Sequence, residues 1–133
     1  MPSTDPLADL LVAIRNASMA QLDTARVSDS RFRQAVLRVL QAEGFIKSFR
    51  VTSGNAPQRV LEIQLNYGPK RERLFLGAKR ISRPGRRVYA GIDELAPYLR
   101  KMEILLISTP SGVMTGAQAF ARKTGGELLC QVW

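Results

Sequence analysis

The chain has 133 residues, of which 45% are hydrophobic, and it carries a formal net charge of +9 with one cysteine and no histidine. This composition supports a packed core, excludes an internal disulfide, and argues against a zinc site and against catalysis by histidine. No apolar run approaches the roughly 20 residues of a membrane span, and the N-terminus lacks the basic region typical of a signal peptide.

The first part of the chain has the spacing of two amphipathic helices. Asp5-Pro6 is typical of an N-cap followed by proline, and the apolar spacing after it predicts a helix from 6 to about 19. Residues 23–28 are a short strand candidate. Cap residues at 28–30 begin a second predicted helix, which Gly44 ends.

A hairpin is predicted next. Residues 45–52 and 59–67 have strand character, and residues 53–58 between them have turn chemistry. The second strand alternates apolar and polar residues, which indicates one buried face and one face in water. Together these elements predict an N-terminal αβαββ domain over residues 1–67.

Residues 68–87 are predicted to be a basic connector between two domains. Residues 46–87 hold eleven basic and two acidic side chains, whereas the parts before and after them each sum to zero. Within that segment, residues 70–87 have eight basic residues against Glu72 alone. A localised charge of this kind indicates a polyanion partner such as nucleic acid; the alternatives are a solubilising face or, more remotely, a membrane-surface segment.

The last part of the chain alternates strands with short helices. Thr115 and Gln118 fit a capping box, and Gly125-Gly126 is expected to end the helix that they begin. The predicted elements are a strand from RRVYAGI, a short helix that Asp93 caps and that runs through Leu99, a core strand over 103–108, a helix from Thr115 to about Lys123, and a final strand over 127–133. This order indicates an α+β protein of two small α/β domains, in which residues 88–133 form the β-rich C-terminal one with a short helix.

A run of small hydroxyls and turn-formers follows the core strand, from Ser108 to Gly112. Ser111 lacks the flanking glycines of a nucleophile elbow, and the chain has no histidine to activate it, which argues against a hydrolase. Hydroxyls on a turn can instead approach bases, riboses or phosphates closely. The arginines of SRPGRR could attract phosphates, and Tyr89 could stack on a base. From composition alone, an ordinary strand-end turn remains the more frequent explanation.

Three motifs resemble the bacterial-type small-subunit ribosomal protein S eight family. The run ISTPSGVMT…GGELLCQVW is similar to the family's S-T-S-x-G-V-M-T, nine residues, G-G-E and closing V-W, and nine residues also separate Thr115 from Gly125 here. TDPLADLLVAIRNA and RISRPGRRVY carry the resemblance at the start and in the middle of the chain. The match therefore spans essentially the whole sequence.

The resemblance implies a structural constituent of the small ribosomal subunit, not an enzyme, with no cofactor and no metal. Such a protein binds the central domain of small-subunit ribosomal RNA and helps its assembly, as a monomer beside neighbouring small-subunit proteins and away from membranes. The alternative is a free translational repressor that binds its own messenger RNA through the same surface. The ribosome would be that of a bacterium or of an organelle, either mitochondrion or plastid.

The resemblance also implies which residues contact RNA, in three groups. The first helix would touch a second RNA helix, the middle motif would meet the adjacent backbone, and the C-terminal motif would hold the RNA core. The residues are, in that order, Thr4, Asp5, Arg15 and Asn16; Arg83, Pro84, Gly85, Arg86, Arg87 and Tyr89; and Ser108, Thr109, Pro110, Ser111, Gly112, Gly125, Gly126 and Glu127.

The chain departs from the family pattern in three places. Pro110 stands where the family usually has serine, and Lys101-Met102-Glu103 replaces glycine-leucine-glycine before the core strand. The run after Met114-Thr115 lacks the family's D-R-E-A-R charges, since it reads Gly116 to Phe120 as GAQAF.

Overall fold

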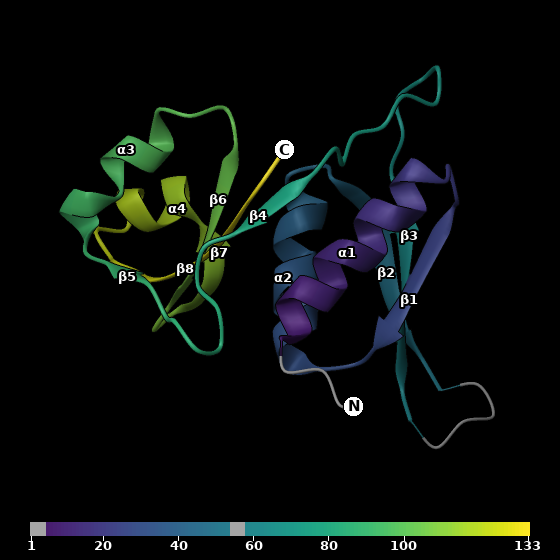
Figure 1. Cartoon of the computed structure of the whole chain (residues 1–133), viewed down its shortest axis with the longest axis horizontal. Helices are drawn as coiled ribbons and strands as arrows, with labels where there is room; N and C mark the ends of the chain where they lie inside the picture. The colour runs from purple at the N-terminus through teal and green to yellow at the C-terminus, as the bar shows by residue number, and fades with distance from the viewer. Residues whose placement is uncertain (1–4, 54–57) are drawn as a thin grey trace. The chain divides into compact units, whose positions relative to one another are not determined.

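The structure, a computed structural model, describes residues 5–53 and 58–133, and it consists of two compact units, Met1–Leu76 and Gly77–Trp133 (Figure 1). The boundary lies inside the segment 68–87, for which the sequence predicts a connector. Residues 77–87 belong to the second unit because the strand Ala78–Arg80 pairs with the last strand of the chain. No helix among the described residues is long and apolar enough to cross a membrane.

The first unit has the α-β-α-β-β order that the sequence predicts. Its sheet is antiparallel, in the order β1-β3-β2, and the hairpin strands β2 and β3 pair directly. The turn predicted between them lies mostly outside the described residues. The elements are α1 (Pro6–Met19), β1 (Thr24–Ser28), α2 (Arg31–Ala42), β2 (Ile46–Thr52) and β3 (Val60–Leu65).

Side-chain caps and one glycine fix the two helices where the sequence predicts them. The Asp5 carboxylate accepts a hydrogen bond from the backbone N–H of Ala8 at 3.1 Å and so caps α1. Ser30 caps α2 in the same way through the N–H of Arg33. Gly44, after α2, has a φ of +84°, a conformation that side chains with a Cβ rarely adopt.

Arg33 is a buried arginine that joins three elements of the first unit. It is only 7% exposed. Its guanidinium donates to the Pro6 carbonyl at the start of α1 through Nε and Nη2, at 3.1 and 3.0 Å. It also donates to the carbonyl and hydroxyl oxygens of Ser28 at the end of β1, at 3.1 and 2.7 Å. A buried charge needs such partners, and these bonds therefore hold α1, β1 and α2 together.

The second unit is β-rich with short helices, as the sequence predicts. Its five-stranded sheet has the order β4-β8-β6-β7, and β5 also pairs with β8. The elements are β4 (Ala78–Arg80), β5 (Tyr89–Ala90), the 3-10 helix η1 (Ile92–Glu94), α3 (Ala96–Leu99), β6 (Ile104–Thr109), β7 (Gly112–Thr115), α4 (Gly116–Ala121) and β8 (Gly126–Val132). The core between the sheet and the helices contains Leu95, Leu105, Ile107, Met114, Ala119 and Leu128.

Three details of the second unit differ from the sequence prediction. The run after the core strand is a two-residue hairpin turn that leads into β7, a strand that the sequence analysis did not predict. Helix α4 ends at Ala121 with Lys123 at a φ of 56°, so Gly125-Gly126 does not end it. Gly91, rather than Asp93, occupies the N-cap position of η1. The capping box is confirmed: Thr115 and Gln118 exchange side-chain to backbone hydrogen bonds at 3.0 and 3.1 Å.

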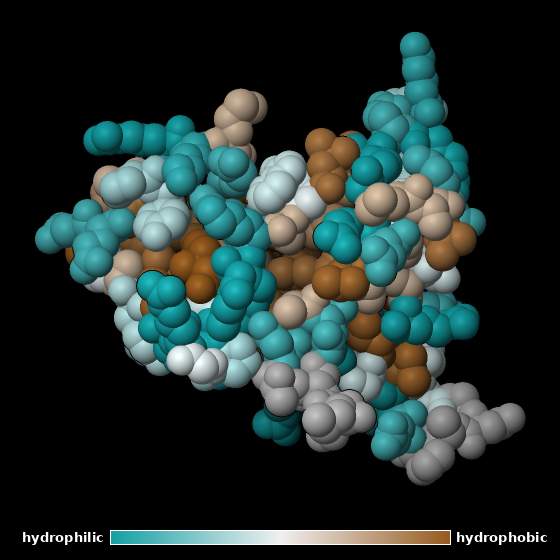
Figure 2. Space-filling view, in the orientation of Figure 1, coloured by the Kyte–Doolittle hydropathy of each residue, from teal (hydrophilic) through white to brown (hydrophobic). Residues whose placement is uncertain are grey.

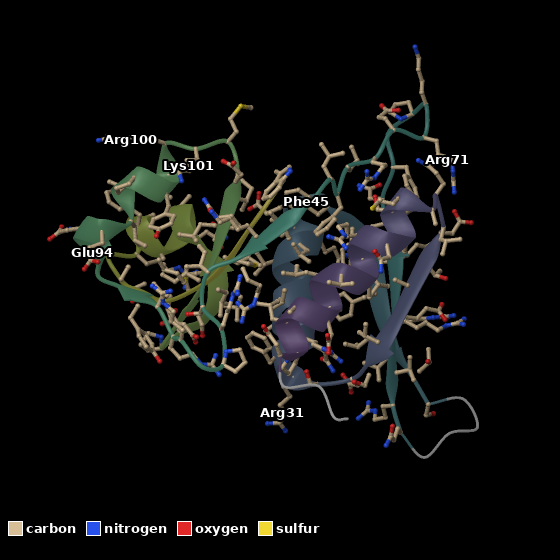
Figure 3. All side chains as sticks on the ribbon, viewed as in Figure 1. Arg31, Phe45, Arg71, Glu94, Arg100 and Lys101 are labelled. Carbon is tan, nitrogen blue, oxygen red and sulfur yellow. The ribbon has the colours of Figure 1, made fainter. Side chains whose placement is uncertain are left out.

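We expect Arg33→Met to lower the free energy of unfolding by about 2–4 kcal/mol, because it removes the hydrogen bonds that the buried guanidinium donates to Pro6 and Ser28. The matched control is Arg31→Met on the same helix. Arg31 is exposed and extends away from the start of α2 (Figure 3). Urea unfolding of both variants measures the difference, and equal stabilities would contradict a structural role for Arg33.

Candidate nucleic-acid interface

Strand β8 aligns side chains from four strands in one row. Tyr89 on β5 pairs with Glu127 on β8, and Glu127 pairs with Ser108 on β6. Ser108 in turn pairs with Val113 on β7. Residues that lie directly opposite each other in antiparallel strands project from the same face of the sheet. We call Tyr89, Glu127, Ser108 and Val113 the cross-strand row; it brings together three of the residues that the sequence singles out.

Gly125 and Gly126 allow the strands beside this row to approach closely. A Cβ at Gly126 would overlap the carbonyl oxygen of Ser108, and a Cβ at Gly125 would overlap the carbonyl oxygen of Ala90. Backbone atoms cannot move aside as the end of a flexible side chain can. The two glycines are therefore required for the pairing of β8 with β5 and β6, whatever else they contact.

The hydroxyl turn, Thr109 to Gly112, is held by one of its own side chains. Thr109 is 8% exposed, and its hydroxyl accepts from the N–H of Ser111 at 3.1 Å and donates to the carbonyl of Gly112 at 2.9 Å. Gly112 has a φ of +120°, and Pro110 and Ser111 form the exposed tip. The Thr109 hydroxyl thus shapes the turn, whereas Ser111 presents its hydroxyl to solvent.

The arginine loop, Ser82 to Val88, leaves the sheet and returns to it on one side of β8. Ser82 is fully buried, and its hydroxyl accepts from the N–H of Val88 at 2.7 Å and donates to the carbonyl of the same residue at 3.2 Å. Both ends of the loop also bond to the backbone of Leu128. Figure 2 shows hydrophilic side chains around this loop, which runs between β4 and β5 in Figure 1.

Within the loop, the backbone forms a second small hairpin. Arg83 and Arg86 exchange two backbone hydrogen bonds at 3.0 and 2.9 Å, with Pro84-Gly85 as the turn between them. The side chains of Arg83 and Arg86 are exposed and form no ion pair within the described part of the chain. The loop therefore offers two guanidinium groups to solvent from a fixed backbone.

Arg87 connects the arginine loop to the cross-strand row. Its guanidinium lies 3.0 Å from the Glu127 carboxylate, whose side chain is 17% exposed. This pair orients both side chains and offsets one positive charge of the loop. The hydroxyl turn and the arginine loop thus lie on opposite sides of β8, and Glu127 and its strand partners span the distance between them.

The basic segment 70–87 does not act as one block. Arg71 pairs with Asp23 at 3.0 Å and lies over the ring of Tyr67, with its Cζ 4.7 Å from the ring centroid. Arg73 donates to the Ser18 hydroxyl at 3.0 Å, and Arg80 donates to the Leu129 carbonyl. These arginines serve the fold of one unit or the other, so fewer positive charges are available for a partner than the sequence count indicates.

The candidate residues of the first unit lie on or beside α1. Asp5 caps the helix, and Arg15 and Asn16 are exposed on its surface. Thr4 lies outside the described residues. These side chains are carried by a different unit from the hydroxyl turn and the arginine loop.

A second arginine cluster in the first unit was not predicted from the sequence. Arg26 and Arg50, on strands either side of β3, both pair with Glu62, at 3.2 and 2.9 Å. Hydrogen bonds from Arg50, and then from Arg26, hold the pKa of the Glu62 carboxyl below its usual value. The sequence could have indicated this arginine cluster only if the pairing register of the three strands had been known, because Arg26 and Arg50 both lie opposite Glu62.

The sequence matches the family described as Ribosomal protein S8 over residues 5–133. The chain belongs to this family. It is 44% identical over 129 residues to the small ribosomal subunit protein uS8 of Caldicellulosiruptor bescii, a match that covers 97% of each chain. It is also 44% identical to the protein of the same name from Thermus aquaticus, over 98% of this chain and 99% of that one. A third relative, from Caldanaerobacter subterraneus, is 43% identical over the full length of both chains.

Family membership makes the chain a structural ribosomal protein and not an enzyme. Within the described residues there is also no group of three or more histidine, cysteine or acidic side chains that could hold a metal ion. The structure shows where two of the differences from the family pattern lie. Pro110 is the first residue at the tip of the hydroxyl turn, and Lys101-Met102-Glu103 is the loop between α3 and β6.

We expect Thr109→Val to lower the stability of the protein by about 1–2 kcal/mol, because valine keeps the shape of threonine but removes both turn hydrogen bonds. Ser111→Ala is the control, since its hydroxyl forms no hydrogen bond among the described residues, and it should unfold like the original protein. Thermal unfolding measures both. If Ser111→Ala proved as destabilising as Thr109→Val, the assignment of the two hydroxyls would be wrong.

Proposed function

We propose that the chain binds the central domain of small-subunit ribosomal RNA and helps that domain to assemble, through the hydroxyl turn, the cross-strand row and the arginine loop. The observation that carries the proposal is the connection of exposed guanidinium groups to an exposed neutral turn by a single strand, β8. The relatives are named as small-subunit proteins, which supports a ribosomal partner.

The two parts of this surface suit different parts of an RNA. The side chains of Arg83 and Arg86 attract phosphates, which gives affinity with little sequence preference. The Ser111 hydroxyl and the backbone at Gly112 reach only a short distance, so they require close approach to a base edge or ribose. An irregular RNA helix with unpaired nucleotides offers both kinds of contact.

Individual residues take distinct roles under this proposal. Ser108 and Glu127 offer a hydroxyl and a carboxylate acceptor from the cross-strand row, while Arg87 positions Glu127. Thr109 shapes the turn. Other members of the surface contribute through backbone or ring contacts, namely Pro84, Gly85, Tyr89, Pro110, Gly125 and Gly126. The helix α1, with Thr4, Asp5, Arg15 and Asn16, would contact a second RNA helix.

The protein would act as a monomer among neighbouring small-subunit proteins, in the ribosome of a bacterium or an organelle. The same surface could also bind the chain's own messenger RNA and repress its translation. That alternative needs no additional residues, so it is separated from the first by the choice of RNA in a binding experiment.

We expect Arg86→Gln to weaken binding to a central-domain transcript and to reduce the slope of log affinity against log salt by about 0.7 to 0.9, because one phosphate contact is lost. Lys70→Gln is the control. It removes the same charge from an exposed side chain in the first unit. Filter binding over a range of salt concentrations measures both slopes.

Equal effects of the two substitutions would mean that net charge, rather than the arginine loop, determines binding. A competition with the chain's own messenger RNA completes the experiment. Preferential binding of the messenger RNA over the ribosomal transcript would replace the assembly role by the repressor role.

A further inference from the structure

A pocket of about 420 Å³ lies in the second unit, between β5 and the η1–α3 segment. Its apolar lining includes Val88 and Leu128, and its polar lining includes Glu94 and Lys101. Two tyrosines, Tyr89 and Tyr98, also line the pocket. Glu94 and Lys101 come from η1 and from the loop after α3, at the two ends of that segment (Figure 3).

Tyr98 is held in place from one side. It is half-buried and packs against the core cluster of the second unit. The ammonium group of Lys101 lies 5.9 Å from the centroid of the Tyr98 ring. The ammonium lies over the ring, so the exposed part of Tyr98 offers an aromatic surface with a positive charge beside it. The packing of Tyr98 against the core fixes the backbone that carries it.

We propose that this pocket holds one unpaired nucleotide of the bound RNA, with the base stacked on Tyr98 and the phosphate near Lys101. This inference rests on the proposed function, because the nucleotide belongs to the RNA that the hydroxyl turn and the arginine loop bind.

The chemistry of the lining fits a nucleotide better than an apolar ligand. The volume lies at the lower end of the range for small-molecule sites and suits one nucleotide. Bases stack on aromatic side chains, and a lysine ammonium pairs with phosphate as a point charge. The Glu94 carboxylate, which accepts from the Gly91 N–H at 3.4 Å, retains acceptor sites that an exocyclic amino group of a base could use.

The position of the pocket connects it with the proposed RNA surface. Tyr89 belongs to the cross-strand row and also lines the pocket, so strand β5 has the row on one side and the pocket on the other. An RNA strand that contacts Glu127 and Tyr89 would pass around β5 to place a neighbouring base against Tyr98. The covalent link to bound RNA then raises the effective concentration of that base at the pocket.

The test compares two substitutions of one ring in the full chain. Tyr98→Leu keeps apolar packing against the core and removes the stacking surface, whereas Tyr98→Phe keeps both. Chemical footprinting with dimethyl sulfate on a full-length small-subunit ribosomal RNA transcript should show a local group of protected nucleotides with the original protein and with Tyr98→Phe. With Tyr98→Leu, one of these nucleotides should become reactive while the others stay protected, and affinity should fall about 5- to 100-fold.

An unchanged footprint and affinity with Tyr98→Leu would overturn the pocket proposal and leave the proposed function in place. Absence of any footprint with the original protein would overturn the proposed function, and the pocket proposal with it. Unfolding of each variant in urea checks that Tyr98→Leu remains folded; if it does not, Lys101→Gln replaces it, with the same released nucleotide expected and a salt slope lower by about 0.7 to 0.9.

A free nucleotide could occupy the same pocket, because it also carries a base and a phosphate. Titration with adenosine monophosphate alone should show no saturable binding at concentrations at which the RNA saturates the protein. Tight binding of the free nucleotide that Tyr98→Leu abolishes, together with an unchanged RNA footprint, would assign the pocket to a free ligand and contradict the proposal.

Discussion

The close pairing of β8 with β5 on one edge and β6 on the other is the constraint on which the functional surface depends. Gly125 and Gly126 permit it, because any side chain at either position would overlap a backbone carbonyl of the neighbouring strand. This pairing places Glu127 between Tyr89 and Ser108. Without it, the hydroxyl turn and the arginine loop would belong to separate parts of the second unit.

Some hydroxyl groups of the second unit hold its loops in shape, and another is exposed to solvent. Ser82 and Thr109 are both buried and both satisfied, and each fixes a loop by bonding to backbone groups a few residues away. Ser111 is exposed because Thr109 holds the turn that carries it. The arginines divide similarly, since Arg73 and Arg80 bind backbone or side-chain oxygens of their own unit, whereas Arg83 and Arg86 remain available. A rigid backbone with a few free groups suits recognition, because binding then orders little that was not ordered before.

Much of this fold follows from local sequence patterns. The caps at Asp5 and Ser30, the capping box at Thr115 and the alternation along β3 each depend on residues that are near one another in the chain, and the structure confirms them. The strand β7 was missed because it has four residues and depends on pairing with β6, which no local pattern reports. Ser82 was missed for a related reason: nothing in its immediate sequence separates a buried loop clamp from a surface serine. The distribution of the basic segment over two units could not be predicted either, since it depends on which oxygens the folded chain brings to each arginine.

The central claim is that the hydroxyl turn and the arginine loop contact one segment of RNA. Cys130 is buried, so a cysteine introduced at an exposed position can be labelled selectively. Ser111→Cys and Arg86→Cys, each carrying an iron chelate, would generate hydroxyl radicals from the two sides of β8 in the complex with small-subunit ribosomal RNA. We predict overlapping cleavage of one RNA segment from both positions. Cleavage in two segments that are distant in the folded RNA, or from only one of the two positions, would contradict the account.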